Sequence, residues 1–126
     1  MTDQGVTKAR FIAEGNRACE KALREKDRAV QHNLESAGAN LGNSSRAKSL
    51  AYLAQNVVIP VYEEVPNELR NLGAPSGDEQ QVQNLVASYE AALRVAENDP
   101  TRLIESNPFE AADKSAQAYG LTACVL

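Results

Sequence analysis

Apolar residues recur at intervals of three and four along most of the chain, a spacing typical of amphipathic α-helices and not of strands. Residues 6–37 form the first such segment, and Gly38 and Gly42 follow it. We predict one long helix here. Its apolar face carries Ile12, Cys19, Leu23, Val30, Leu34 and, between the two glycines, Leu41.

A second apolar stripe begins after Asn43-Ser44-Ser45, which are favourable helix N-cap residues, and runs in phase to Leu72. Pro60 and Pro66 interrupt this stripe. A proline inside a helix removes a backbone hydrogen bond and clashes with the preceding turn. Because the stripe stays in phase past both prolines, we predict one helix, kinked at the prolines and closed by Gly73.

Two further helices are predicted in the second half of the chain. The third opens with the capping-box spacing of residues 76–79 and ends at 98–100. Residues 100–106 can hold one short helical turn. The fourth starts with Asn107 as N-cap and Pro108 as first residue, and it stops at Gly120, with Leu121 as the hydrophobic partner of that stop.

Four helices joined by short connections predict an all-α fold. We expect an antiparallel up-down four-helix bundle with three long helices and a short C-terminal fourth, the second helix being kinked at its prolines. The 126 residues suit one domain, so residues 1–126 are predicted to form a single helical bundle.

Two cysteines lie near opposite ends of the chain, Cys19 in the first helix and Cys124 after the fourth. With a rise of about 1.5 Å per residue, Cys19 lies roughly 20 Å above the base of the bundle and the fourth helix ends roughly 17 Å above it. This agreement in height predicts a structural disulfide, which is typical of oxidising compartments. The alternative is two separate buried thiols in a cytosolic protein.

Both ends of the chain carry a recognisable pattern around the cysteines. The pattern consists of Phe11-Ile12-Ala13 before Cys19, Asn107-Pro108-Phe109-Glu110-Ala111-Ala112, Ala116, and Tyr119-Gly120-Leu121 before Cys124. It resembles that of an uncharacterised family of small exported helical proteins and lipoproteins from high-GC Gram-positive (actinobacterial) bacteria. The resemblance leaves the middle of the chain uncovered. It implies an extracytoplasmic bundle with a terminal disulfide and transfers no catalytic residue.

The charge balance disfavours a nucleic acid or an anionic membrane surface as partner. The chain has 13 Lys and Arg against 17 Asp and Glu and carries no basic stripe. No apolar run approaches the roughly 20 residues that cross a bilayer. We expect membrane attachment only through a lipid anchor, with the export signal absent from the printed chain.

The sequence offers little for catalysis, and we predict no cofactor and no metal. His32 is the single histidine and is expected at the flank or in solvent, where it could not serve a triad. The residue three before it is Ala29, so the Glu-x-x-His pattern of di-metal bundles is missing. Glu63, Glu64 and Glu68 cluster near the prolines, and Glu64 and Glu68 share a face that could bind a hard cation weakly. A solvated face is the preferred explanation of these carboxylates.

The prolines suggest one candidate ligand groove between the second and third helices. Tyr62 and Tyr89 would edge it, with Glu64 and Glu68 nearby. The alternative is that the bend only wraps the second helix around the core.

These observations favour a non-enzymatic extracytoplasmic module that binds a protein partner or a small ligand at the cell envelope. One alternative is a small-ligand carrier with a cavity beside the kink at Pro60 and Pro66. Others are a cytosolic interaction protein with unpaired thiols and a hydrolase or metal enzyme built on Glu63, Glu64 and Glu68.

Overall fold

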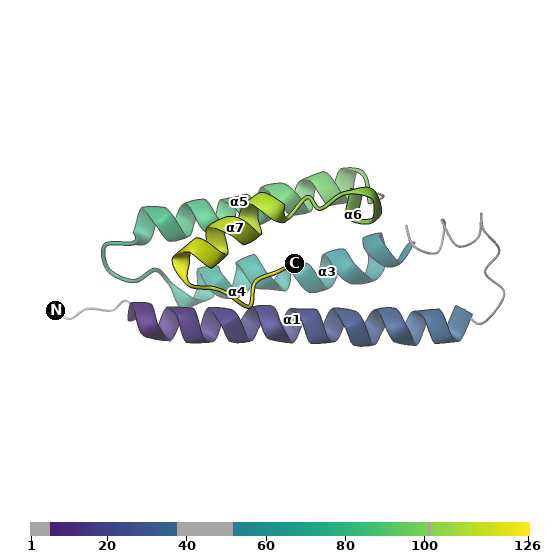
Figure 1. Ribbon diagram of the computed structural model, residues 1–126, viewed down its shortest axis with the longest axis horizontal. Coiled ribbons are helices and arrows are strands. Elements are labelled where there is room, and N and C mark those ends of the chain that lie inside the picture. Colours follow the sequence, from purple (N-terminus) through teal and green to yellow (C-terminus); the bar gives the residue numbers. More distant parts are fainter. Residues whose placement is uncertain (1–5, 38–51, 101) are drawn as a thin grey trace.

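The computed structural model describes residues 6–37, 52–100 and 102–126, and this part of the chain is helical throughout its regular elements. Figure 1 shows α3 and α4 running between α1 and α5, with α7 lying against α5. The predicted all-α class is confirmed for the described residues. In chain order the elements are α1 (Lys8–Ala37), the π-helical turn η1 (Ala54–Val58), α3 (Ile59–Tyr62), α4 (Glu64–Leu72), α5 (Glu79–Asn98), α6 (Arg102–Glu105) and α7 (Glu110–Tyr119).

The buried face of α1 differs from the predicted one. Ile12, Leu23 and Val30 were expected to be central, but each is only partly buried. Leu34, Leu41, Gly38 and Gly42 lie outside the residues whose side chains are described. The buried non-glycine side chains of this helix are Phe11, Ala18, Cys19 and Ala22.

Gly15 explains this rotation of the buried face. A Cβ atom at Gly15 would lie 2.6 Å from Leu121 Cδ2 and 3.2 Å from Leu69 Cδ2. The glycine therefore lets α4 and the C-terminal segment approach α1 closely, which turns Phe11 and Ala18 inward. The prediction missed this face because a stripe defined by large apolar residues ignores glycine.

Residues 52–72 form one interrupted helix, as predicted, although its predicted start at Asn43–Ser45 lies outside the described residues. Before Pro60 the backbone widens into a π-helical turn, in which the Ile59 N–H donates to the carbonyl of Ala54. Glu63 then separates α3 from α4, three residues before Pro66. Gly73, at φ 78°, ends the segment at the predicted residue.

The start of α5 was predicted wrongly. The helix begins at Glu79 and not within the Ser76 capping box. Glu79 Oε1 accepts a hydrogen bond from the Gly77 N–H at 3.0 Å. Asp78, the N-cap residue, makes no side-chain cap because its carboxylate accepts the Tyr119 hydroxyl at 2.7 Å. A tertiary contact from α7 thus replaces the local cap.

The fourth helix, α7, starts two residues later than predicted but ends where expected. Asn107 Oδ1 accepts the Phe109 N–H at 3.0 Å and so orders the turn before the helix. At the other end Gly120 has φ 115°, and the Leu121 N–H donates to the Ala116 carbonyl at 2.8 Å. This is a Schellman stop, with Leu121 fully buried as its hydrophobic partner. The predicted turn at 100–106 is present as α6.

Aromatic side chains join the helices into one apolar core. Phe11 of α1 meets Tyr119 of α7 edge-on, with 5.6 Å between ring centroids, and Tyr62 meets Phe109 in the same way at 5.4 Å. The core includes residues of α1, α3, α4, α5 and α7. None of the helices in the described part of the chain has the length and apolar character that crossing a membrane requires.

Candidate functional site

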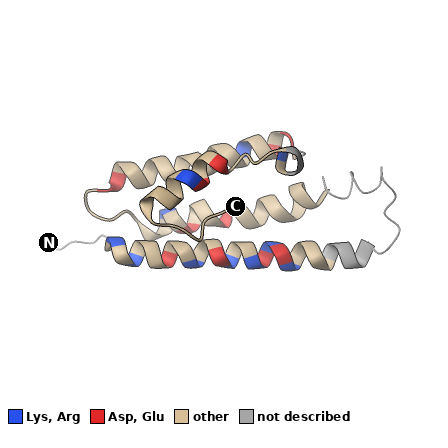
Figure 2. Ribbon diagram, in the orientation of Figure 1, with Lys and Arg blue, Asp and Glu red and all other residues tan. Residues whose placement is uncertain are grey.

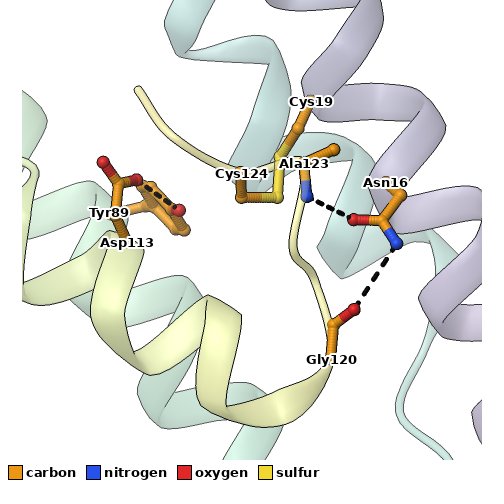
Figure 3. Close-up of a disulfide and its surroundings, with 7 residues drawn as sticks. All are labelled: Asn16, Cys19, Tyr89, Asp113, Gly120, Ala123 and Cys124. Atoms are coloured by element: carbon orange, nitrogen blue, oxygen red, sulfur yellow. Dashed lines mark hydrogen bonds between the residues drawn. A yellow bond between two sulfur atoms is a disulfide. The ribbon is translucent and has the colours of Figure 1, made fainter.

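A disulfide joins Cys19 of α1 to Cys124 in the segment after α7, as predicted (Figure 3). The two Cα atoms are 5.1 Å apart and the residues are 105 positions apart in sequence. Neither side chain is exposed. A buried disulfide that closes a long loop acts as a structural link, since a reactive cysteine needs access to solvent.

Asn16, one turn before Cys19, binds the same C-terminal segment. Its Oδ1 accepts the Ala123 N–H at 2.9 Å, and its Nδ2 donates to the Gly120 carbonyl at 3.4 Å (Figure 3). The amide therefore satisfies backbone groups on both sides of the turn that leads to Cys124. Sequence reasoning missed Asn16, although its position three residues before a buried cysteine places it near the same face.

A buried carboxylate in α7 provides the third contact to this segment. Asp113 is 6% exposed, and its Oδ1 accepts the Tyr89 hydroxyl of α5 at 2.8 Å (Figure 3). The backbone N–H of Leu126 also donates to this carboxylate. We call Asn16, the disulfide and the Asp113–Tyr89 pair the C-terminal clasp.

Burial controls the ionisation of the clasp. Loss of solvent raises the pKa of Asp113 above its ordinary value, and the hydrogen bonds from Tyr89 and Leu126 offset part of that rise. Burial also raises the pKa of the Tyr89 phenol, and the neighbouring Asp113 carboxylate adds to the rise. Tyr89 therefore stays protonated and donates, while Asp113 accepts.

The four residues of the predicted groove are not brought together. Tyr62 and Tyr89 are both buried, and the Tyr89 hydroxyl is engaged by Asp113. Glu64 and Glu68 instead face α1, where Lys21 Nζ lies 3.9 Å from Glu68 Oε1. Burial raises the pKa of Glu64, and Glu25 of α1 adds to the rise while Lys21 opposes it.

The other residues considered for chemistry are also dispersed. Glu63 lines a depression of about 210 Å³ with α5, away from the side of α4 that carries Glu64 and Glu68. His32 is exposed on α1. Within residues 6–37, 52–100 and 102–126, no cluster of three or more His, Cys, Asp or Glu side chains could hold a metal ion.

A half-open, mostly apolar pocket of about 270 Å³, called the cavity below, lies beside the interrupted helix, next to the π-helical turn. Two polar side chains, Lys26 and Tyr62, also line it. The site therefore combines an apolar wall with one cation and one hydroxyl. The apolar lining consists of Val30, Leu53, Ala54, Val58, Leu103 and Leu126.

A second, larger depression of about 430 Å³ lies between α4 and α5. Its floor includes Leu69, Val82 and Val86, and an ion pair between Arg70 and Glu90 lies at its rim. Arg70 and Glu90 are paired with each other, and the carboxylate of Glu79 also lines this depression.

Acidic and basic residues are interspersed along α1 in Figure 2, so this helix presents no surface of one sign. Glu14 with Arg17, and Lys21 with Glu25, form exposed pairs along it. Such a mixed surface lacks the electrostatic footprint that binds nucleic-acid phosphates.

Comparison with known proteins gives no family and no neighbour for this chain: no family model, no curated protein and no solved structure matches it.

Proposed function

We propose that this chain is a non-enzymatic module of the cell envelope that works outside the cytoplasm and binds a protein partner or a small ligand. The observation that carries the proposal is the fully buried Cys19–Cys124 disulfide. Bonds of this kind persist in secreted and periplasmic compartments and are rare where glutathione and thioredoxin keep thiols reduced. Any contact with the membrane is then made through a lipid anchor outside the printed chain.

The arrangement of helices proposed for this module is an antiparallel up-down four-helix bundle. Contacts between successive segments support it: α1 packs on α4, α4 on α5, and α5 on α7. The connection between α4 and α5 is short, which favours antiparallel neighbours. The resemblance of both chain ends to exported actinobacterial proteins also supports a helical bundle that works outside the cytoplasm.

A catalytic role on the three glutamates has less support. Glu63 borders α5 while Glu68 pairs with Lys21 of α1, so their carboxylates do not converge on one point. If a metal enzyme were built there, Glu68→Ala would abolish metal binding. We expect no change in binding of Mg²⁺ or Ca²⁺ by calorimetry.

The second candidate function is that of a small-ligand carrier, favoured by the cavity of about 270 Å³ beside the π-helical turn. Cavities with an apolar wall and few polar groups are the usual form of a small-molecule site.

Cell fractionation tests the main proposal. The gene with its natural upstream sequence, carrying a C-terminal tag, is expressed in its own host. Thiols are then blocked in intact cells before lysis. We expect the tagged protein in the envelope or medium with both cysteines inaccessible to the blocking reagent even after denaturation. Recovery from the cytosol with two alkylated cysteines would support the cytosolic interaction protein instead.

A further inference from the structure

The cavity beside the interrupted helix has one polar end. Among the described residues that line it, Lys26 and Tyr62 supply the polar side chains, and the Lys26 ammonium interacts with the Tyr62 hydroxyl. The remaining lining residues are apolar. An elongated ligand with one polar head matches this division better than a ligand that is polar along its whole length.

The polar end carries positive charge. Burial alone would lower the pKa of Lys26, but its hydrogen bond to Asp27 and the nearby Tyr62 outweigh burial and raise it. Asp27 Oδ1 lies 2.6 Å from Lys26 Nζ, but the Asp27 side chain is 71% exposed while that of Lys26 is 26% exposed. An exposed partner contributes little to such a pair, so a carboxylate entering the cavity can compete for the ammonium.

A second carboxylate that acts on this end is already engaged. Asp113 acts electrostatically on Tyr62, but burial raises the pKa of Asp113 and its carboxylate already accepts hydrogen bonds from Tyr89 and Leu126. The Tyr62 phenol also has a raised pKa, mainly through burial, so its hydroxyl keeps the proton and can donate.

The apolar end is built by the π-helical turn. Ala54 and Val58 of η1 face the cavity together with Leu103 of α6. Single π-helical turns inside longer helices occur frequently at functional sites. The volume of about 270 Å³ is at the lower limit of small-molecule sites, which start at about 300 Å³, so the ligand must be short.

We propose that this cavity binds a medium-chain aliphatic carboxylate, with its head group on Lys26 and Tyr62 and its tail against the wall formed by η1 and Leu103. The inference rests on the carrier function and names the ligand class of that cavity. Charge complementarity favours the carboxylate over uncharged and cationic amphiphiles of the same length.

Calorimetric titration of the oxidised full chain with three probes of equal chain length tests this. The probes are decanoate, decanol and decylammonium, each below its aggregation concentration. We expect saturable binding of decanoate, weaker binding of decanol and the weakest binding of decylammonium. Lys26→Met should weaken decanoate binding about tenfold, the value of one charge-assisted hydrogen bond, and leave decanol binding unchanged.

Two further variants keep the test specific. Lys21→Met removes the same charge from α1 outside the cavity, where Lys21 pairs with Glu25 and Glu68, and should leave decanoate binding unchanged. Val30→Phe fills the cavity from a partly exposed position and should weaken decanoate and decanol alike. Circular dichroism of each variant confirms that it is folded.

Equal binding of the acid and the alcohol, with no effect of Lys26→Met, would overturn the ligand class and leave the carrier function standing. Binding of none of the three probes would overturn both the ligand class and the carrier function. Neither result would affect the disulfide-closed envelope module, which fractionation tests separately.

Discussion

The C-terminal clasp and the interrupted helix at residues 52–72 are held by different kinds of interaction. The clasp uses one covalent bond and side-chain hydrogen bonds between residues as far apart as Asn16 and Ala123. The interrupted helix is held by apolar packing and by a backbone that adjusts its own hydrogen bonds around Pro60 and Pro66.

This difference separates a fixed part of the molecule from an adaptable one. In the clasp the polar side chains have defined partners, so the chain end has a single place on α1. Beside the π-helical turn the lining is mostly apolar and a cavity remains. We infer that the clasp maintains the fold and that the interrupted helix shapes the surface available to a ligand.

The largest expected effect comes from removing the disulfide. The double variant Cys19→Ala/Cys124→Ala should lose about 2–5 kcal/mol of unfolding free energy, since a long loop is freed in the unfolded chain. Guanidinium unfolding measures this. Reductant should destabilise the wild type by a similar amount and leave the variant unchanged. A loss below about 1 kcal/mol would show that the clasp does not depend on its covalent bond.

Tyr89→Phe should have the next largest effect. It removes a donor from the buried Asp113 carboxylate while keeping the ring that packs beside Phe109. We expect a loss of about 1–3 kcal/mol at neutral pH, because a buried acceptor is left short of a partner. Tyr52→Phe, at an exposed tyrosine, is the matched control and should be neutral. If Tyr89→Phe and Tyr52→Phe were equally stable, the hydrogen bond between Tyr89 and Asp113 would not contribute to the stability of the clasp.

Asn16→Ala should cost about 1 kcal/mol, mainly through the lost bond to the Ala123 N–H. Asn16→Asp keeps that acceptor but places a carboxylate oxygen opposite the Gly120 carbonyl, so it should recover at most part of the stability. The rate of disulfide reduction by dithiothreitol is the second readout, and it should increase in Asn16→Ala. An unchanged rate would mean that Asn16 does not hold the segment around Cys124.

The pH dependence of stability should report Asp113. Its pKa is raised in the folded state, so the folded protein holds a proton that the unfolded chain has already lost. The contribution of Asp113 to the free energy of unfolding is complete below its ordinary pKa of 3.8. This contribution is lost as the pH rises through the pKa that Asp113 has in the folded state. Relative to Asp113→Asn, the wild type should therefore lose stability as pH rises from 3 to 7. A gain over that range would contradict the raised pKa.

Pro60→Ala should have the smallest effect, because Pro60 is exposed and its side chain forms no hydrogen bond. The variant regains a backbone N–H four residues after Asn56 and should convert the π-helical turn to regular α-helix. We expect a change in unfolding free energy between zero and about 1 kcal/mol, with altered amide chemical shifts at Val57–Ile59. If Pro60→Ala lost as much free energy of unfolding as the disulfide variant, the clasp and the interrupted helix would not differ in how strongly they stabilise the fold.

The sequence predicted the features of this fold that depend on local chemistry. The cysteine pair followed from helix rise and length, and the stop at Gly120 followed from a glycine with a hydrophobic residue after it. Both depend only on residues close together in sequence or on simple helix geometry.

The partners within the clasp could not be predicted in this way. Asn16 meets Ala123 only because Gly15 lets α1 turn Phe11 and Ala18 inward, and Asp113 meets Tyr89 only at the observed register of α7 on α5. The burial of Tyr62 and Tyr89, which were expected at the edge of the groove, also depends on tertiary packing that the sequence pattern does not show. Proline in the sequence marked the interruption but did not distinguish a π-helical turn from a bend.

Peptide mapping of the protein purified from its own host, alkylated in denaturant without reduction, tests the central claim most directly. Trypsin should release the peptide of residues 18–21 joined to that of residues 115–126, with no alkylated cysteine detected. Two separate alkylated peptides would contradict the disulfide-closed module and the extracytoplasmic function proposed for it.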